Sequence, residues 1–177
     1  MEVFSQLVQN VFIPCMARVY QRMERPVIKN IPEVLRVEIG RTEIAESIKP
    51  GMRIAISCGV ANIALVIREL VNICKERGAK PFIFPAMGSH GGATAVGQLE
   101  TLTSLGVTEE YCGCPVISSM ETVNPCKTKS GIPIFIDKSA WHADGIIVVG
   151  RIKAHTAFRG QYESGLMKMI AIGLGKR

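Results

Sequence analysis

Two histidines and one lysine of this sequence have surroundings suited to chemistry, and the first histidine is His90. It lies in a glycine-rich run, Gly-Ser-His-Gly-Gly-Ala-Thr, at residues 88–94. A histidine exchanges protons near neutral pH, and glycines let the backbone approach a ligand closely. A helix that begins after such a turn offers free N–H groups to an anion. The run indicates proton transfer beside an anion, and a glycine-rich turn with an incidental histidine explains it equally well.

The second histidine, His155, follows an apolar run at residues 145–149. It stands close in sequence to three cations, Arg151, Lys153 and Arg159. Loops that follow strands commonly carry function in folds that alternate strands and helices. The cluster of cations favours an anion-binding loop, and the alternative is a solvated polar loop.

The lysine, Lys168, lies within an apolar run at residues 166–172. Removal from water favours the neutral and nucleophilic form of a lysine, so Lys168 is a candidate for covalent chemistry. Ser164 and Gly165 precede it and would let the backbone come close to a ligand. The alternative is a lysine that extends its charge out of an apolar patch.

The elements that must position these residues alternate between short apolar strands and amphipathic helices. Strands are expected at residues 34–39, 53–57, 81–85, 116–118, 132–136 and 145–149. Helices are expected at residues 44–48, 61–77, 95–105 and 138–142. Thr94, Thr108 and Asp137 are expected to cap helix starts. Two short helical pieces are expected within Val3–Met23. This alternation predicts an α/β fold, a Rossmann-like, mostly parallel sheet with helices on both faces. Residues 1–33 are expected to form an N-terminal helical extension and residues 34–177 the domain.

The parallel sheet has a consequence for the candidate residues. The carboxyl ends of parallel strands line a common crevice. Asn62 follows the strand expected at residues 53–57, and His90 and His155 follow the strands expected at residues 81–85 and 145–149. We therefore expect these three residues to face one cleft.

Size and charge limit the class of protein. The chain has 177 residues, which suits one domain with a core, and a net charge of +6. Its basic residues are scattered without aromatic residues between them, so an anionic small molecule explains the charge and no nucleic-acid partner is predicted. No apolar run reaches the roughly 18 residues that span a membrane. The N-terminus lacks the pattern of a secretory signal, so a cytoplasmic location is expected.

Six cysteines raise the possibility of a metal site. Cys112, Cys114 and Cys126 could form part of an iron–sulfur or zinc site. No pair has the two-residue spacing typical of such sites, which favours free thiols. An iron–sulfur protein remains an alternative interpretation.

Three features, in order, resemble the nickel-dependent lactate racemase family, specifically its N-terminal domain. The first is the strand and glycine-rich run that contain His90. The second is the pair of segments Ile-Asp-Lys-Ser-Ala and Ala-Asp-Gly-Ile-Ile-Val within residues 136–148. The third is Ile-Lys-Ala-His at residues 152–155, followed by Ser-Gly-Leu-Met-Lys at residues 164–168. The resemblance covers residues 34–177.

The resemblance implies a racemase or epimerase, an isomerase that inverts a 2-hydroxy acid by reversible hydride transfer. Its cofactor is a nickel-pincer nucleotide, a pyridinium mononucleotide whose two sulfur arms and one ring carbon hold nickel. Lys168 corresponds to the lysine that carries this cofactor, and His90 and His155 to the acid/base pair on opposite faces of the substrate. The family's nickel-ligating histidine would fall after residue 177. The cofactor contacts expected besides Lys168 are Gly91, Gly92, Thr94, Ser164 and Gly165.

The sequence also departs from the family's lactate enzymes. They carry Asp-His-Thr-Arg-Pro after the strand that corresponds to residues 53–57, whereas this chain has Cys-Gly-Val-Ala-Asn, and Gly91 replaces a further arginine. We therefore expect a 2-hydroxy acid or polyol acid other than lactate, contacted by Asn62 and Arg159. The family's second domain is not within these residues, so this domain alone is expected to be inactive. A non-catalytic module of the same fold that binds an anionic nucleotide is the alternative.

Overall fold

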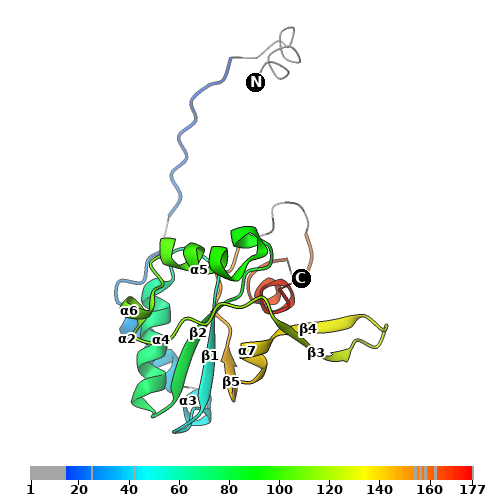
Figure 1. Cartoon of the computed structure of the whole chain (residues 1–177). Coiled ribbons are helices and arrows are strands. Elements are labelled where there is room, and N and C mark those ends of the chain that lie inside the picture. The colour runs from blue at the N-terminus through cyan, green and yellow to red at the C-terminus, as the bar shows by residue number, and fades with distance from the viewer. Residues whose placement is uncertain are drawn as a thin grey trace.

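The computed structural model describes residues 15–24, 26–41, 43–153, 155, 157, 159–161 and 163–176. Figure 1 shows a central sheet flanked by helices, a hairpin that projects from one side, and an N-terminal arm that leaves the body. No helix within these ranges is long and apolar enough to cross a membrane. The architecture is mixed α/β.

The central sheet has three parallel strands, β1 (Arg53–Cys58), β2 (Lys80–Pro85) and β5 (Gly145–Ile147). Their order is β2-β1-β5, so β1 pairs with a strand on each side. The strands predicted at residues 53–57 and 81–85 are confirmed, and the one predicted at 145–149 is shorter. A strand buried on both faces needs a continuous apolar run, which is why these segments could be recognised.

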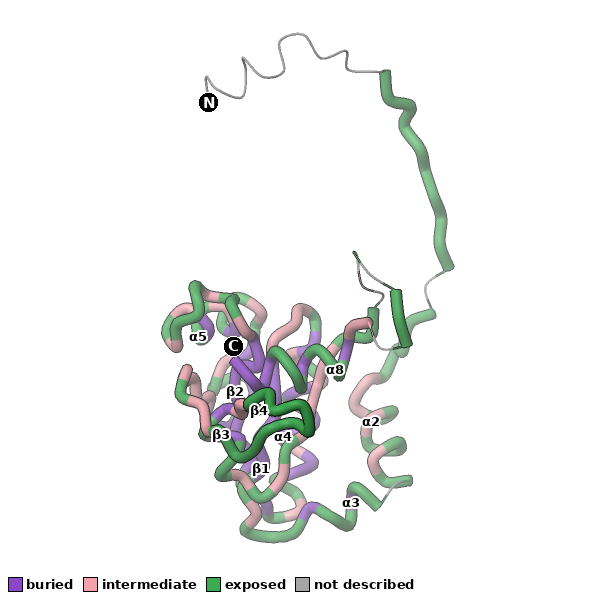
Figure 2. Tube along the Cα trace, turned by 90° about the vertical axis from the view of Figure 1, so that its right-hand side faces the viewer, coloured by how far each residue is buried: buried purple, intermediate pink, exposed green. Residues whose placement is uncertain are grey.

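Helices cover both faces of this sheet, as predicted. Ile54 and Ile56 of β1 point to one face, where they join an apolar cluster with Ile67 of α4 (Ala64–Glu76). Ala55 points to the other face and joins a cluster with buried residues of the C-terminal helix. Figure 2 shows the buried strands at the centre of the body. The alternation along β1 therefore sends successive side chains into two separate cores.

Three helices begin at capping side chains that the sequence identified. The helices are α5 (Ala95–Ser104), α6 (Glu109–Cys112) and α7 (Lys138–Trp141). Thr94, Thr108 and Asp137 each accept the backbone N–H three residues later, at 3.1, 3.1 and 2.9 Å. Such a bond satisfies one of the unpaired N–H groups at a helix start.

The strand predicted at residues 34–39 is wrong, because these residues belong to helix α2 (Ile31–Gly40). Asn30 caps the helix by accepting the N–H of Glu33 at 3.3 Å. Pro32 lies in the first turn, where its fixed φ favours a helix. Both the cap and the proline are visible in the sequence as signs of a helix start. The alternation of apolar and charged residues suggested a strand instead.

Contacts with another helix fix α2 in place. Arg36 forms ion pairs with Glu69 at 2.6 Å and with Glu76 at 2.7 Å, both on α4. These carboxylates lie far along the chain, so no local pattern could include them. The short helix predicted next, α3 (Ile44–Ser47), is confirmed.

Beside the parallel sheet lies an antiparallel hairpin of β3 (Thr122–Lys127) and β4 (Pro133–Asp137). The strand predicted at residues 132–136 is therefore present as β4, but it pairs with β3 outside the main sheet. The prediction missed β3, which contains Pro125. Its register shifts between Val123 and Cys126, and such an irregularity accommodates a proline that cannot donate to the ladder.

The strand predicted at residues 116–118 is not formed as a strand. Val116 makes only one isolated parallel bridge, to Ile83 of β2. The backbone N–H of Ile117 donates to the Ile83 carbonyl at 2.8 Å, and the N–H of Ile83 donates to the Pro115 carbonyl at 2.9 Å. The segment lies along the edge of β2 without extending the sheet as a regular strand.

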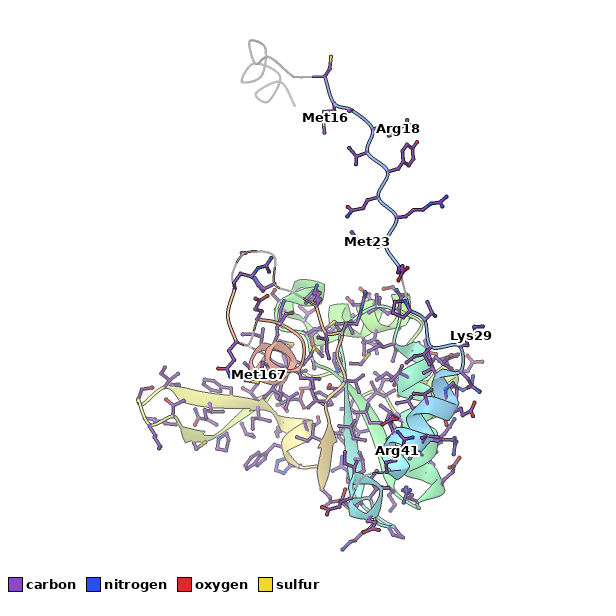
Figure 3. The ribbon with its side chains drawn as sticks, turned by 180° about the vertical axis from the view of Figure 1, so that it is seen from behind. Met16, Arg18, Met23, Lys29, Arg41 and Met167 are labelled. Atoms are coloured by element: carbon purple, nitrogen blue, oxygen red, sulfur yellow. The ribbon has the colours of Figure 1, made fainter. Side chains whose placement is uncertain are left out.

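Two terminal segments complete the fold. At the C-terminal end, α8 (Leu166–Lys168) continues into a π-helix, η2 (Met169–Leu174). At the other end, residues 15–24 form an extended arm with exposed side chains (Figures 1 and 3). Two short helical pieces were predicted within Val3–Met23. The prediction is wrong for residues 15–23, and residues 3–14 lie outside the described residues. Met16 is 92% exposed, and a short helix with nothing to pack against is marginal in water.

Candidate functional site

A cavity of about 330 Å³ lies where the three parallel strands end. Its lining from the loops after β1, β2 and β5 consists of Gly59, Val60, Ala86, Met87, Gly88, Ser89, His90, Arg151 and Lys153. The opposite wall consists of Ser164, Gly165, Lys168, Met169, Ile172 and Gly173. The loops after all three strands therefore meet at one cavity, as the parallel topology predicts.

His90 lies at this cavity as the first residue of the short 3₁₀ turn η1 (His90–Ala93), and it is exposed. The next two residues, Gly91 and Gly92, have φ of +61° and +64°, a region that favours glycine. The Thr94 hydroxyl donates to the Gly91 carbonyl at 2.9 Å and closes the turn. Gly91, Gly92 and Thr94 shape the turn without lining the cavity, and their contact with a cofactor stays a prediction.

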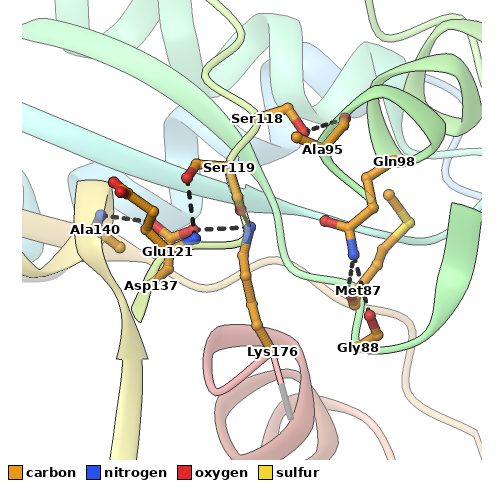
Figure 4. A network of polar contacts seen from close by, with 10 residues as sticks. All are labelled: Met87, Gly88, Ala95, Gln98, Ser118, Ser119, Glu121, Asp137, Ala140 and Lys176. Carbon is orange, nitrogen blue, oxygen red and sulfur yellow. Dashed lines mark hydrogen bonds and ion pairs between the residues drawn. The ribbon is translucent and has the colours of Figure 1, made fainter. Parts of the chain in front are cut away.

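A buried glutamine that the sequence analysis missed supports the same wall. Gln98 of α5 is fully buried, and its amide donates to the carbonyls of Met87 and Gly88, the latter at 3.1 Å (Figure 4). It thereby ties α5 to the segment after β2. The available signal was a polar residue one helical turn before Leu102, on the buried face of the helix.

Lys168 lines the cavity together with Arg151 and Lys153. Its apolar neighbours in sequence do not bury it, because the side chain is exposed. Among the described lining residues there is no carboxylate. A concave site lined by one sign of charge raises the local concentration of ions of the opposite sign, so this cavity is suited to an anionic ligand.

Two glycines allow close packing on the Ala86 carbonyl just after β2: Gly173 on the lysine-bearing helix and Gly59 just after β1. A Cβ at Gly173 would lie 2.6 Å from the carbonyl oxygen of Ala86, and one at Gly59 would lie 2.7 Å from the same atom. Real Cβ atoms essentially never come this close, so both positions require glycine. The missing side chains set the position of this wall of the cavity.

His155 lies in the loop beside the cavity and is not among the residues that line it. The residue is partly buried, and its backbone N–H donates to Glu163 Oε2 at 3.0 Å. Its Nδ1 accepts the N–H of Ala157 at 3.0 Å. The cavity lining includes Lys153 before His155 and Ser164 after it. The two stems of the loop therefore belong to the site, while the role of His155 stays a prediction.

The two residues expected to contact substrate also lie away from the cavity lining. Arg159 donates to the His155 carbonyl at 3.0 Å and to Glu163 at 3.4 Å, within its own loop. Asn62 is exposed in the turn before α4, with φ of +62°. Their substrate contacts stay predictions.

Glu163, which the sequence analysis also missed, organises this loop. Its carboxylate accepts the N–H groups of His155 and Gly160, at 3.0 and 3.2 Å, and pairs with Arg159. The His155 N–H and then the Gly160 N–H hold the pKa of Glu163 below its usual range. Nothing in the local sequence distinguishes this carboxylate from a solvated one.

Replacing Glu163 by glutamine is expected to loosen the loop. Because the pKa is lowered on folding, the ionised carboxylate stabilises the loop above the pKa of the unfolded chain, and this effect disappears as the pH falls through the lower folded pKa. At neutral pH we expect exchange of the His155 and Gly160 amide protons to accelerate about tenfold. Hydrogen exchange measured by NMR tests this, with exposed Glu100→Gln as the control. Unchanged exchange in Glu163→Gln would contradict the assignment.

The structure does not bring the three cysteines of the iron–sulfur alternative together. Cys112 and Cys114 are buried at α6, whereas Cys126 is exposed on β3. Figure 1 places α6 and the hairpin at opposite sides of the body. Within the described ranges no group of three histidine, cysteine, aspartate or glutamate residues could hold a metal ion.

Alkylation of the native protein tests this arrangement. Burial raises the pKa of Cys58 and of Cys114 to about 12, which leaves almost no reactive thiolate at neutral pH. We expect iodoacetamide to modify Cys126 about a hundredfold faster than either, until denaturant is added. Peptide mass spectrometry over a time course measures the rates. Equal labelling of Cys114 and Cys126 in the native state would contradict the structure.

The geometry joins part of the expected site. His90, Lys168, Ser164 and Gly165 line one cavity, and the loop that carries His155 adjoins it. Comparison of the chain with protein-family models, curated proteins and solved structures gives no match in any of the three.

Proposed function

We propose that this chain, with a Rossmann-like fold, is the cofactor-carrying domain of a lactate racemase-like 2-hydroxy acid racemase or epimerase. The observation that carries the proposal is the shared cavity of Lys168 and His90, which Arg151 and Lys153 also line. A primary amine that can form a covalent bond, an acid/base side chain and basic side chains in one concave site are the groups that such an enzyme needs.

The residues present fit a nickel-pincer nucleotide. The cavity volume of about 330 Å³ lies at the lower end of the range for small-molecule sites. The Lys168 side chain is exposed at the cavity and therefore open to covalent attachment. Lys153 lines the same cavity and matches the negative charge of a mononucleotide phosphate, which leaves Arg151 for the substrate. When bound, the cofactor would supply a hydride acceptor.

The remaining roles belong to side chains of this chain. The His90 imidazole accepts the hydroxyl proton of the substrate, which makes the α-hydrogen easier to remove as hydride. Inversion requires a second acid/base group on the opposite face, and we assign it to His155. The proximity of His155 supports this assignment, since Lys153 before it and Ser164 after it both line the cavity.

Binding of the substrate carboxylate is assigned to Arg151 alongside the expected contacts of Asn62 and Arg159. Arg151 lines the cavity, whereas Arg159 bonds within its own loop. A guanidinium binds a carboxylate through two parallel hydrogen bonds. The substrate class is a 2-hydroxy acid or a polyol acid.

The second candidate function is a non-catalytic module that binds an anionic nucleotide in the same cavity. The observation that favours it is the position of His155 outside the lining. The cations and the glycine-shaped walls would serve either function. Covalent attachment of the cofactor and turnover are expected only of the racemase.

The experiment is mass spectrometry of the protein purified from a host that makes the pincer cofactor, with nickel quantified in parallel. The racemase proposal predicts an adduct on the peptide that contains Lys168, together with stoichiometric nickel. In the enzyme assembled with the second domain that the resemblance implies, His90→Gln is expected to keep the adduct and to abolish racemisation. Unmodified Lys168 and absence of nickel would instead favour the binding module.

A further inference from the structure

Lys176 is a buried lysine that none of the proposed roles uses. Its side chain is 0% exposed, and its Nζ lies 2.8 Å from Oδ2 of Asp137, which is 1% exposed. Nζ also donates to the carbonyl of Ser119 (Figure 4). A buried charge is retained only when it is paired and hydrogen-bonded, and Lys176 is both.

The backbone at Lys176 has the left-handed conformation that often ends a helix, and its N–H donates to the Ile172 carbonyl at 3.0 Å. Its φ is +54°, in the left-handed region that residues other than glycine seldom adopt. Such a conformation persists only where the surroundings over-determine it. The ion pair and the bond to Ser119 hold its side chain at this helix end, together with the backbone bond to Ile172.

Lys176 anchors the helix that presents Lys168 to the cavity. Residues 173–176 are buried, whereas residues 166–168 are exposed. Met169, next to Lys168, packs in the cluster on the sheet, and the far end of the helix is held at Lys176. The position of the Lys176 end therefore contributes to where Lys168 lies.

The same anchor is connected to the opposite wall of the cavity. Ser119, which accepts from Lys176, follows Ser118, whose hydroxyl donates to the Ala95 carbonyl at 2.6 Å. Ala95 is the first residue of α5, and Gln98 of α5 holds the segment that precedes His90. Figure 4 shows these contacts as a chain from Lys176 to Gly88. One short segment is thus bonded to α5, which supports one wall, and to the end of the helix that forms the other.

We propose that Lys176 is a positioning residue that acts with Asp137 to set the spacing between Lys168 and His90 across the cavity. This inference rests on the proposed function for the importance of that spacing. The ion pair itself fixes the rotation and the height of the lysine-bearing helix. Removing it displaces the Lys168 amine from the cations that share its cavity.

The test uses pyridoxal 5′-phosphate as a probe, since it carries an aldehyde and a phosphate. The Lys168 amine forms a carbon–nitrogen double bond with the aldehyde and releases water, and borohydride then reduces the imine to a stable amine. Peptide mapping gives the labelling rate of each lysine. In the wild type we expect Lys168 to react about tenfold faster than exposed Lys49 and Lys129, because Arg151 and Lys153 attract the phosphate.

Lys176→Met and the double variant Asp137→Asn with Lys176→Met test the positioning role. Asparagine keeps the cap of α7, and the double variant buries no unpaired charge, so it is expected to fold. A purely structural pair predicts that the double variant recovers wild-type labelling of Lys168. A positioning role predicts labelling about tenfold slower in both variants, with Lys49 unchanged. Lys138→Met, which breaks the exposed ion pair with Glu121, is the matched control and should label as the wild type does.

Wild-type labelling of Lys168 by the folded double variant would overturn the inference. Failure of the proposed function gives a different result, in which wild-type Lys168 reacts no faster than Lys49. In that case, amide hydrogen exchange of residues 169–174 tests the positioning role of Lys176 independently of the proposed function. Faster exchange in the double variant supports it, and unchanged exchange overturns it.

Discussion

Replacement of Lys168 by arginine is expected to abolish covalent loading of the protein while leaving its fold intact. The side chain is exposed at the cavity, so arginine can occupy the same space and keep the positive charge. A guanidinium stays protonated and is not a nucleophile, so it binds the anion without forming a bond to it. Intact-mass spectrometry of protein from a cofactor-producing host should show the adduct fall from stoichiometric to undetectable.

Lys153→Arg is the matched control, because it makes the same substitution in the same cavity. Its adduct should remain on the peptide that contains Lys168. An adduct on the Lys168→Arg protein would place the attachment elsewhere. Loss of the adduct in Lys153→Arg would mean that the loading depends on the ammonium groups collectively and not on one nucleophile.

Asp137→Ala is expected to cause the largest loss of stability of any single polar substitution considered for this chain. It leaves the Lys176 ammonium buried without its partner at 2.8 Å. Breaking a buried pair from one side typically costs about 3–5 kcal/mol. It also removes the cap of α7, because Asp137 accepts the Ala140 N–H. Urea unfolding followed by circular dichroism measures the difference in the free energy of unfolding.

Glu121→Ala gives the comparison, because it breaks an ion pair with Lys138 that is open to solvent. Exposed pairs contribute about 1 kcal/mol or less. The two substitutions remove the same kind of group from neighbouring positions, and burial of the pair is the main difference. Equal losses of stability would show that the Asp137–Lys176 pair is not desolvated in solution.

The sheet and the helix caps could be predicted because their causes are local. Residues 54–56 and 81–85 are apolar in sequence because both of their faces are covered. Thr94 and Asp137 each accept a hydrogen bond from three residues further on, so a short window of sequence contains the whole interaction. Such features require no knowledge of the tertiary structure.

Helix α2 and the hairpin could not be predicted so directly, because distant contacts decide them. Residues 34–39 alternate as a strand would, and ion pairs of Arg36 with α4 help to hold them as a helix. The strand β3 contains Pro125, which argues against a strand unless the register irregularity is known. In both cases tertiary context overrode the local pattern.

In the candidate site, too, the features with local causes could be predicted and those that depend on distant contacts could not. The expected parallel direction of the three strands was enough to place His90 at a cavity with the segment after β5, but His155 and Asn62, expected at the same cleft, do not line it. Lys176 was missed because lysines are almost never fully buried without a partner, and its partner Asp137 belongs to another element. Glu163 was missed because its partners are backbone N–H groups, which come within hydrogen-bond distance of it only in the folded loop.

The two glycines packed on the Ala86 carbonyl give the site a recognisable sequence signature. Gly59 directly follows β1, and Gly173 comes five residues after Lys168. Any chain that builds its cavity in this way must keep both glycines, even where the acid/base and substrate-contacting residues differ, since a Cβ at either position would collide with backbone. A pattern search with these two spacings would therefore collect chains that share the architecture of the cavity, whatever reaction each of them performs in it.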